Sequence, residues 1–139
     1  QVMKAGEAEM VKYIGNCFLY EKVVFFNQMY DLATSLGLDY QNIREAVSKD
    51  ERIGDSHTAV AHASGHNQKV LGRGAGGHCF IKDFEAMMEL YKRTLPEDVR
   101  GYEALMSVRE KNNELLVKSK KDVDLLKGVI GDISRYEDR

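Results

Sequence analysis

The stretch Glu7-Ala-Glu-Met-Val-Lys-Tyr-Ile-Gly-Asn-Cys-Phe-Leu-Tyr-Glu-Lys-Val-Val-Phe-Phe-Asn-Gln-Met-Tyr-Asp-Leu-Ala-Thr-Ser-Leu36 contains no proline. Its apolar residues recur mostly at steps of three, four or seven, the spacing of one face of an α-helix: Met10, Ile14, Phe18, Phe25, Met29, Leu32 and Leu36. Thirty helical residues would measure about 45 Å, which exceeds the core of a globule of this size. The sequence therefore predicts one long helix, with a helix bent or broken at Gly15 as the alternative.

A second side of this predicted helix is also apolar, at Val11, Val24, Phe26 and Tyr30. A helix with two apolar sides needs a partner for each of them. We therefore expect one side to pack against the helix's own domain and the other against another domain or subunit.

The composition limits the class of protein. A chain of 139 residues suits one domain, and 20 basic against 22 acidic residues argue against a duplex nucleic-acid partner. No apolar run is long enough for a membrane span. Cys17 and Cys79 are too few for a disulfide scaffold, so we expect reduced thiols and a cytoplasmic protein. Because residue 1 is Gln, we expect a piece of a longer protein.

The rest of the chain is predicted to be helical except for one loop-rich segment. Gly37 should end the long helix, and Asp39 should cap a short helix that runs to about Ser48. Residues 50–77 hold six of the twelve glycines and three of the four histidines and read as an extended loop. A further helix should carry Asp83 and Glu85 in its first turn and end at Leu95-Pro96, and a last long helix should run from Pro96 to about Lys118.

The tail is predicted to form one helical turn at residues 122–126 and a short strand at residues 128–131. The overall prediction is an all-α fold, a long central helix with shorter packed helices and a glycine-rich loop. Residues 1–120 are assigned to this domain, and residues 121–139 to a tail or to the start of a truncated α/β domain.

The segment Gly72-Arg-Gly-Ala-Gly-Gly-His-Cys79-Phe-Ile-Lys-Asp83 is the best candidate for chemistry. Four glycines within six residues let a backbone approach a ligand closely. Cys79 follows them just before a predicted helix, whose N-terminus favours a thiolate nucleophile. Asp83 lies one helical turn further on and could orient or deprotonate a water molecule. A buried structural cysteine beside a tight turn is the alternative.

Lys12 and Asn16 form a second candidate pair, because residues four apart share a helix face. A lysine and an amide donor could stabilise an oxyanion that forms when a thiol attacks a carbonyl carbon. A lysine and an asparagine at the surface, without a chemical role, are the alternative. No phosphate-binding or dinucleotide-binding spacing occurs, so these residues offer no cofactor site.

Three segments together resemble the UDP-glucose and GDP-mannose dehydrogenase family in order and spacing. They are Glu9-Met-Val-Lys12-Tyr-Ile-Gly-Asn16-Cys-Phe18-Leu, Asp50-Glu-Arg52-Ile-Gly54 and Gly76-Gly-His-Cys79-Phe-Ile-Lys82-Asp83. The resemblance covers residues 8–118 and implies the family's central, dimer-forming helical domain. The third segment is more similar to the UDP-glucose enzymes than to the GDP-mannose enzymes.

The resemblance implies an activity, the oxidation of a nucleotide sugar such as UDP-glucose to its uronate with two NAD. Cys79 would capture the aldehyde as a thiohemiacetal that is oxidised to a thioester, and Asp83 would help water to hydrolyse the thioester. Lys12 and Asn16 would bind the sugar and stabilise oxyanions near its C6. The implied substrate-binding residues are Arg52, which would reach the neighbouring subunit's site, Gly74, Gly76, Gly77 and Lys82.

The sequence departs from the family at several places. Ala75 and Ile81 stand where members often carry an aromatic residue and a proline. Residues 55–73 form a longer, histidine-rich insertion. The family's N-terminal domain, which binds most of the NAD, has no counterpart in the sequence, and Glu7 and Glu9 do not replace its catalytic residues. The C-terminal domain is at most begun by residues 126–130.

Three other interpretations stay open. Histidines 57, 62, 66 and 78 with Cys79 could form a metal site, although their spacing fixes no geometry and we assign no metal ligand. Cys79 could serve a hydrolase with a histidine base. The chain could also be a non-catalytic helical dimerisation module. The sequence taken alone is expected not to oxidise a substrate.

Overall fold

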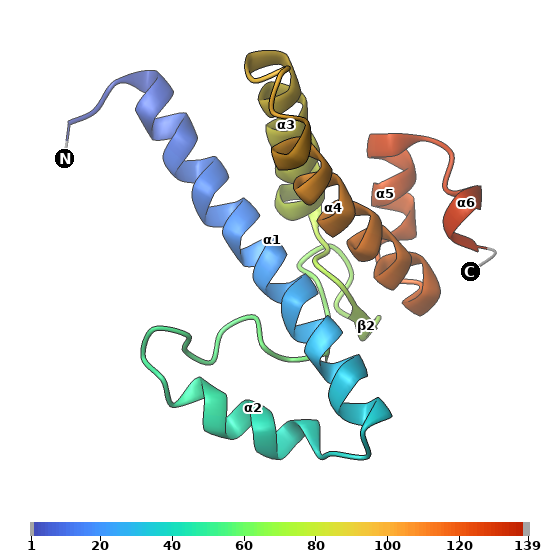
Figure 1. Cartoon of the computed structure of the whole chain (residues 1–139). Coiled ribbons are helices and arrows are strands. Elements are labelled where there is room, and N and C mark those ends of the chain that lie inside the picture. The colour runs from blue at the N-terminus through green and yellow to red at the C-terminus, as the bar shows by residue number, and fades with distance from the viewer. Residues whose placement is uncertain (1, 138–139) are drawn as a thin grey trace.

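The structure, a computed structural model, describes residues 2–137 and is mostly helical. The long helix α1 (Ala5–Ser35) runs continuously through Gly15. The predicted long helix is therefore confirmed, and the alternative of a helix bent or broken at Gly15 is wrong. Helix α2 (Tyr40–Ser48) folds back beside the C-terminal half of α1. Helices α3 (His78–Thr94) and α4 (Val99–Ser119) lie along the N-terminal half of α1 (Figure 1).

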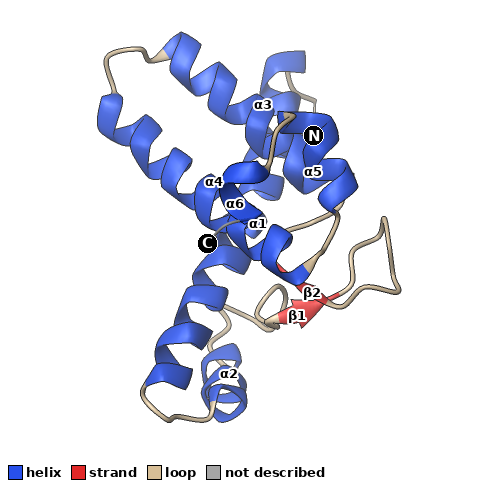
Figure 2. Cartoon of the chain, turned by 90° about the vertical axis from the view of Figure 1, so that its right-hand side faces the viewer, coloured by secondary structure: helices blue, strands red, loops and turns tan. Residues whose placement is uncertain are grey.

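The glycine-rich segment and the insertion connect these two parts of the molecule. Two strands of two residues each, β1 (Ala61–His62) and β2 (Gly72–Arg73), pair antiparallel with Ala61 opposite Arg73. Figure 2 shows this ribbon between α2 and the bundle of α3, α4 and α5. The sequence analysis missed these strands because two residues are too short for an alternating pattern.

The main core lies where α1 meets α3. The Tyr20 and Phe84 rings stack with their centroids 3.9 Å apart, and both side chains are almost fully buried. The other buried members of this cluster are Cys17, Val23, Val24, Ala75 and Met88. Helix α3 begins at His78, earlier than predicted, so Asp83 and Glu85 lie in its second turn and Cys79 lies in its first.

The apolar face that the sequence marks most clearly on α1 is not the buried one. Apart from Met29, its residues are exposed: Met10, Ile14, Phe18, Phe25, Leu32 and Leu36. Of the second apolar side, Val24 and Phe26 are buried and Val11 is exposed. One side of α1 therefore packs within this chain, as predicted, and the other side is exposed in it. That another domain or subunit covers the exposed side stays a prediction.

The predicted strand at the end of the chain is wrong. Residues 123–130 form helix α5 (Val123–Ile130), and α6 (Ser134–Glu137) follows it. The apolar residues of α5 lie at helical spacing, and Leu126 packs with Ile81, Leu116, Ile133 and Tyr136 in a second buried cluster. The boundary predicted after residue 120 stays a prediction, and the residues on its two sides are in contact.

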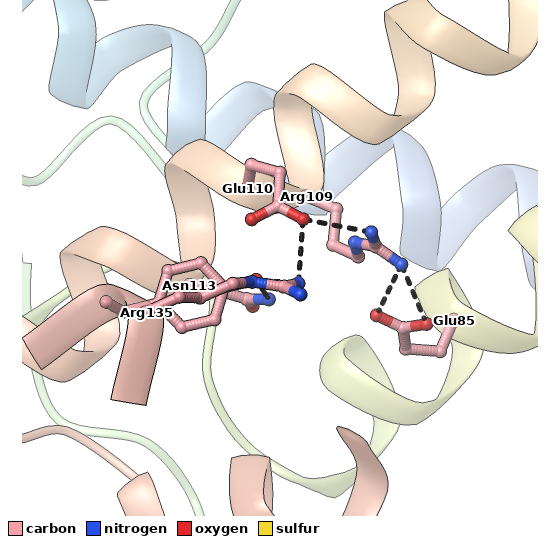
Figure 3. Close-up of polar contacts among 6 residues, drawn as sticks. Glu85, Arg109, Glu110, Asn113 and Arg135 are labelled. Carbon is pink, nitrogen blue, oxygen red and sulfur yellow. Dashed lines mark hydrogen bonds and ion pairs between the residues drawn. The ribbon is translucent and has the colours of Figure 1, made fainter. Parts of the chain in front are cut away.

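Ion pairs attach α6 to α4 and α4 to α3. Arg109 lies 3.4 Å from both carboxylate oxygens of Glu85 and donates to Glu110 at 3.0 Å (Figure 3). The same Glu110 oxygen accepts a hydrogen bond from Arg135 at 2.9 Å. Because the side chains of Arg109 and its two partners are partly shielded from water, these pairs are screened less than fully exposed ones would be, whereas Arg135 is exposed. The tail is thus held to the helical body by charge as well as by apolar packing.

Replacing Phe84 by alanine should lower the free energy of unfolding by roughly 3–5 kcal/mol, because it removes a fully buried ring and leaves a cavity. Urea unfolding followed by circular dichroism measures the change. Leu71→Ala is the control, since Leu71 is 72% exposed and its loss should cost about 0.5 kcal/mol or less. Equal losses in both variants would contradict the assignment of this core.

Candidate active site

Asp83 is the centre of the candidate site. Its side chain is only 6% exposed, at the contact between α3 and α1. Asn16 Nδ2 donates to one carboxylate oxygen at 2.7 Å, and Lys12 Nζ lies 3.6 Å from the other. Lys12 and Asn16 are one helical turn apart on α1, so both can contact Asp83. The structure thus brings together three of the four residues predicted to be catalytic.

Cys79 lies near this group, in the first exposed turn of α3. It precedes Asp83 by four residues, so the two side chains share a face of the helix. The N-terminal end of α3 carries the partial positive charge of the helix dipole. The arrangement therefore places an accessible thiol one turn from a buried carboxylate.

Cys17 differs from Cys79 in its access to solvent. It is buried in the main core, and its Sγ donates to the Asp83 carbonyl oxygen at 3.8 Å. Burial, with the negative charges of Asp83 and Glu21, raises the pKa of Cys17 to about 11. Cys17 is therefore a structural residue, and Cys79 is the thiol that a solute can reach.

The glycine-rich loop is held to α4 by an asparagine. The Ala75 N–H donates to Asn112 Oδ1 at 2.7 Å, and Asn112 Nδ2 donates to the Ala75 carbonyl at 3.0 Å. Gly74 has a φ of +102°, and a Cβ there would lie 3.1 Å from the same Asn112 oxygen. The loop therefore requires glycine at 74, and the small Ala75 side chain is fully buried in the main core.

Arg73 attaches the start of this loop to α1. Its guanidinium donates to Asn27 Oδ1 at 2.8 Å and to Asp31 at 3.0 Å and lies over the Tyr30 ring. Because Asn27 is fully buried, this contact reaches into the core. The loop is thus fixed between α1 on one side and α4 on the other.

Arg52 is not brought to the other predicted residues in this chain. It lies on the turn after α2, where it is exposed and pairs with Asp50 at 2.7 Å. It lines an open groove with Phe18, Phe25 and Ile53 on the exposed side of α1. Of the other predicted substrate-binding residues, Gly76 and Gly77 are half-buried and Lys82 is exposed, all at or near the start of α3.

The sequence analysis missed three residues that hold the loop: Asn112, Lys121 and Asp122. Asn112 read only as part of a helix, and Lys121 read as part of a basic tail. Their separation from their partners in the loop, 37 residues or more, gives no local signal. The adjacent basic and acidic residues Lys121 and Asp122, just after the end of α4, were the one local signal in the sequence.

The histidines of the insertion pack around the loop. His66 Nε2 lies 2.8 Å from Asp124, and the His66 and His78 rings are in contact. Burial, with the positive charge of Lys121, lowers the pKa of His62 to about 4, so His62 is neutral at pH 7. Among residues 2–137, no three His, Cys, Asp or Glu side chains gather as metal ligands would.

The comparisons with known proteins identify the family. Residues 6–114 match the UDP-glucose/GDP-mannose dehydrogenase family, central domain. This match covers most of the chain, so the chain belongs to that family, and the fold resemblance inferred from the sequence is confirmed.

Individual relatives carry more specific names. The UDP-glucose 6-dehydrogenase of Rickettsia bellii is 34% identical over 110 residues, 79% of this chain and 23% of the relative. The UDP-glucose 6-dehydrogenase YwqF of Bacillus subtilis is 30% identical over 125 residues, 89% of this chain and 25% of the relative. That of Pseudomonas aeruginosa is 37% identical over 87 residues, 63% of this chain and 17% of the relative. The chain thus spans a quarter or less of the length of these relatives.

No helix among the described residues is both long and apolar enough to cross a bilayer.

The buried Lys121 predicts a pH dependence of stability. Burial lowers its pKa to about 8, despite the neighbouring charge of Asp122. Between pH 8 and pH 10.5 the unfolded chain binds a proton at Lys121 that the folded chain does not, so this residue makes stability rise with pH. From pH 7.5 to 9.5 the unfolding free energy of wild type should rise by about 2 kcal/mol relative to Lys121→Met.

Urea unfolding at a series of pH values measures this difference. Lys120→Met is the matched control, because Lys120 is adjacent in sequence but exposed. A Lys121→Met profile parallel to that of wild type would show that Lys121 titrates in the folded chain as it does in water.

Proposed function

We propose that this chain forms the thiol-bearing part of a nucleotide-sugar 6-dehydrogenase that oxidises the C6 alcohol of UDP-glucose to the uronate. The observation that carries the proposal is the convergence of Lys12 and Asn16 on Asp83, one helical turn from the exposed Cys79. The family membership and the names of the relatives support the substrate class.

In the proposed reaction Cys79 adds as a thiolate to the C6 aldehyde, forming a carbon–sulfur bond and an oxyanion that takes up a proton. A hydride acceptor bound outside this chain's residues would oxidise this thiohemiacetal to a thioester, with loss of the hydroxyl proton. Water then attacks the thioester, which releases the carboxylate and returns the Cys79 thiol. Asp83 orients that water and accepts its proton, and Lys12 and Asn16 stabilise the oxyanions by charge and by hydrogen bonding.

NAD does not fit the residues of this chain. Between residues 2 and 137 the strands are two residues long and antiparallel, whereas a dinucleotide site needs a parallel sheet with a glycine-rich turn leading into a helix. The cofactor is therefore assigned to the N-terminal domain that the family resemblance implies, and the steps assigned to this chain are those of the thiol and the water.

The chemical role of Cys79 can be tested in a chimera in which residues 1–139 replace the matching region of the Bacillus subtilis relative. The chimera should reduce two NAD for each UDP-glucose, while the chain alone should reduce none. Cys79→Ser should lower uronate formation by roughly 10³-fold or more, because it removes the nucleophile. Product analysis by mass spectrometry, with NADH absorbance, gives both quantities.

Cys17→Ala is the matched control for this experiment. Cys17 is the other thiol of the chain, and it is buried, so its removal should leave uronate formation within a few-fold of the unsubstituted chimera. Uronate formation that survives Cys79→Ser in an active chimera would refute the assignment of the nucleophile.

We also propose that the chain forms a homodimer through the exposed side of α1. Three open apolar grooves lie along this side, and neighbouring grooves share Phe18, Phe25 and Ile53, so the surface is continuous. Exposed apolar surface of this extent is typical of protein–protein interfaces. Arg52 lies at the edge of this surface, where it could enter the site of the partner subunit.

Sedimentation equilibrium tests the dimer. The chain should be dimeric at micromolar concentration, and Phe18→Glu with Phe25→Glu should give a monomer, because two carboxylates would be buried without partners. Val129→Glu is the control, since Val129 is a similarly exposed apolar residue on α5. A wild-type monomer at tens of micromolar would overturn the proposed interface.

A further inference from the structure

A buried pair of opposite charges holds the two ends of the segment Gly74–Gly77. Lys121 is 1% exposed, and its Nζ donates to the Gly74 carbonyl at 2.8 Å. Asp122 is 5% exposed, and one of its carboxylate oxygens accepts the Gly77 N–H at 2.8 Å. The other oxygen accepts the Ser64 hydroxyl at 2.9 Å. Main-chain groups of the loop are thus the direct partners of both charges.

The glycines fit these two side chains closely. A Cβ on Gly72 would lie 2.5 Å from Lys121 Cβ, and a Cβ on Gly76 would lie 2.3 Å from Asp122 Oδ2. Real Cβ contacts are essentially never that short. Because Gly72 and Gly76 have no side chains, Lys121 and Asp122 can approach the main chain of the loop. Gly72 and Gly76, like Gly74, are therefore required by contacts inside the chain.

The turn that carries the pair is itself unusual. Lys120 and Asp122 have φ values of +58° and +50°, which non-glycine residues seldom adopt. Buried charges are also costly unless they are paired and hydrogen-bonded. A turn with two left-handed residues and two buried charges stabilises one particular conformation of the loop. Apolar side chains in the same place would fill the space but would not orient the main-chain groups of the loop.

The pair acts on the residue before the first turn of α3. Gly77 is the N-cap of α3, with a φ of +84°, and its carbonyl accepts the Ile81 N–H. Cys79 lies two residues after Gly77. Fixing the Gly77 N–H therefore fixes the direction in which α3 begins, and with it the free N–H groups of its first turn.

We infer that Lys121 and Asp122 are positioning residues for Cys79, because they fix the Gly77 N-cap and with it the first turn of α3, which carries the thiol. The inference rests on the proposed function only in taking Cys79 as the reacting thiol. It assigns a part in the site to the segment after α4, beyond the residues that match the family.

The test uses the whole chain and two variants that change little else. Lys121→Met keeps the aliphatic stem beside Gly72 and removes the N–H donors, and Asp122→Asn keeps the shape and tolerates a positive φ. Lys120→Met is the matched control from the same turn. The rate of Cys79 alkylation by iodoacetamide and the hydrogen exchange of the residue 75–77 amides are measured by mass spectrometry.

Both variants should raise exchange at residues 75–77 about tenfold, since each loses a charge-assisted hydrogen bond. Alkylation of Cys79 should slow at least threefold at pH 7.5, because the thiol is already exposed and what it loses is its fixed place in the first turn of α3, at the partly positive end of the helix. Exchange at Val23 and Val24 in α1 should not change, which separates the effect from general unfolding. Ser64→Ala, which removes one partner of Asp122, should act in the same direction.

Alkylation and loop exchange equal to those of Lys120→Met would overturn the inference. The result is independent of the proposed function. Slower alkylation with a Cys79→Ser chimera that still forms uronate would support the positioning role and refute the reaction. Unchanged alkylation with a chimera that needs Cys79 would do the reverse.

Discussion

The contact between α1 and α3 determines both the core and the candidate site. Tyr20 stacks on Phe84 in the interior, and Asp83, the residue before Phe84, then meets Lys12 and Asn16 at the edge of the same contact. A change in the crossing of these helices would move the carboxylate away from the amide and the ammonium. Stability and the geometry of the polar group therefore depend on one packing arrangement.

Much of the helical framework could be predicted because its signals are local. Gly37 has a φ of +73° after α1, and Asp39 accepts hydrogen bonds from the Gln41 and Asn42 amides, as an N-cap does. The partners of Asp83 were also predictable in part, since Lys12 and Asn16 share a helix face and recur in the family's motif. The helix ends were thus predicted from local patterns, and the residues around Asp83 from a helix face and a family motif.

The errors arose where a long-range contact decides the outcome. Gly128-Val-Ile read as a strand, but Leu126 packs on Ile81 and Leu116 and holds those residues in a helix. Both sides of α1 are apolar, and the sequence could not tell which of them the rest of the chain covers. Asn112, Lys121 and Asp122 bind Ala75, Gly74 and Gly77, which lie far away in sequence, and a single sequence does not report such pairs.

The residues that fix the loop lie on both sides of the point where the family match ends, at residue 114. Asn112 precedes that point, while Ser119, Lys121 and Asp122 follow it, and Ser119 accepts the Arg73 N–H. A protein trimmed to the family boundaries would keep the proposed nucleophile and lose most of the scaffold that shapes its surroundings. Domain limits drawn from sequence similarity and the limits of the physical unit thus differ here, and the difference falls beside the thiol that we propose as the nucleophile.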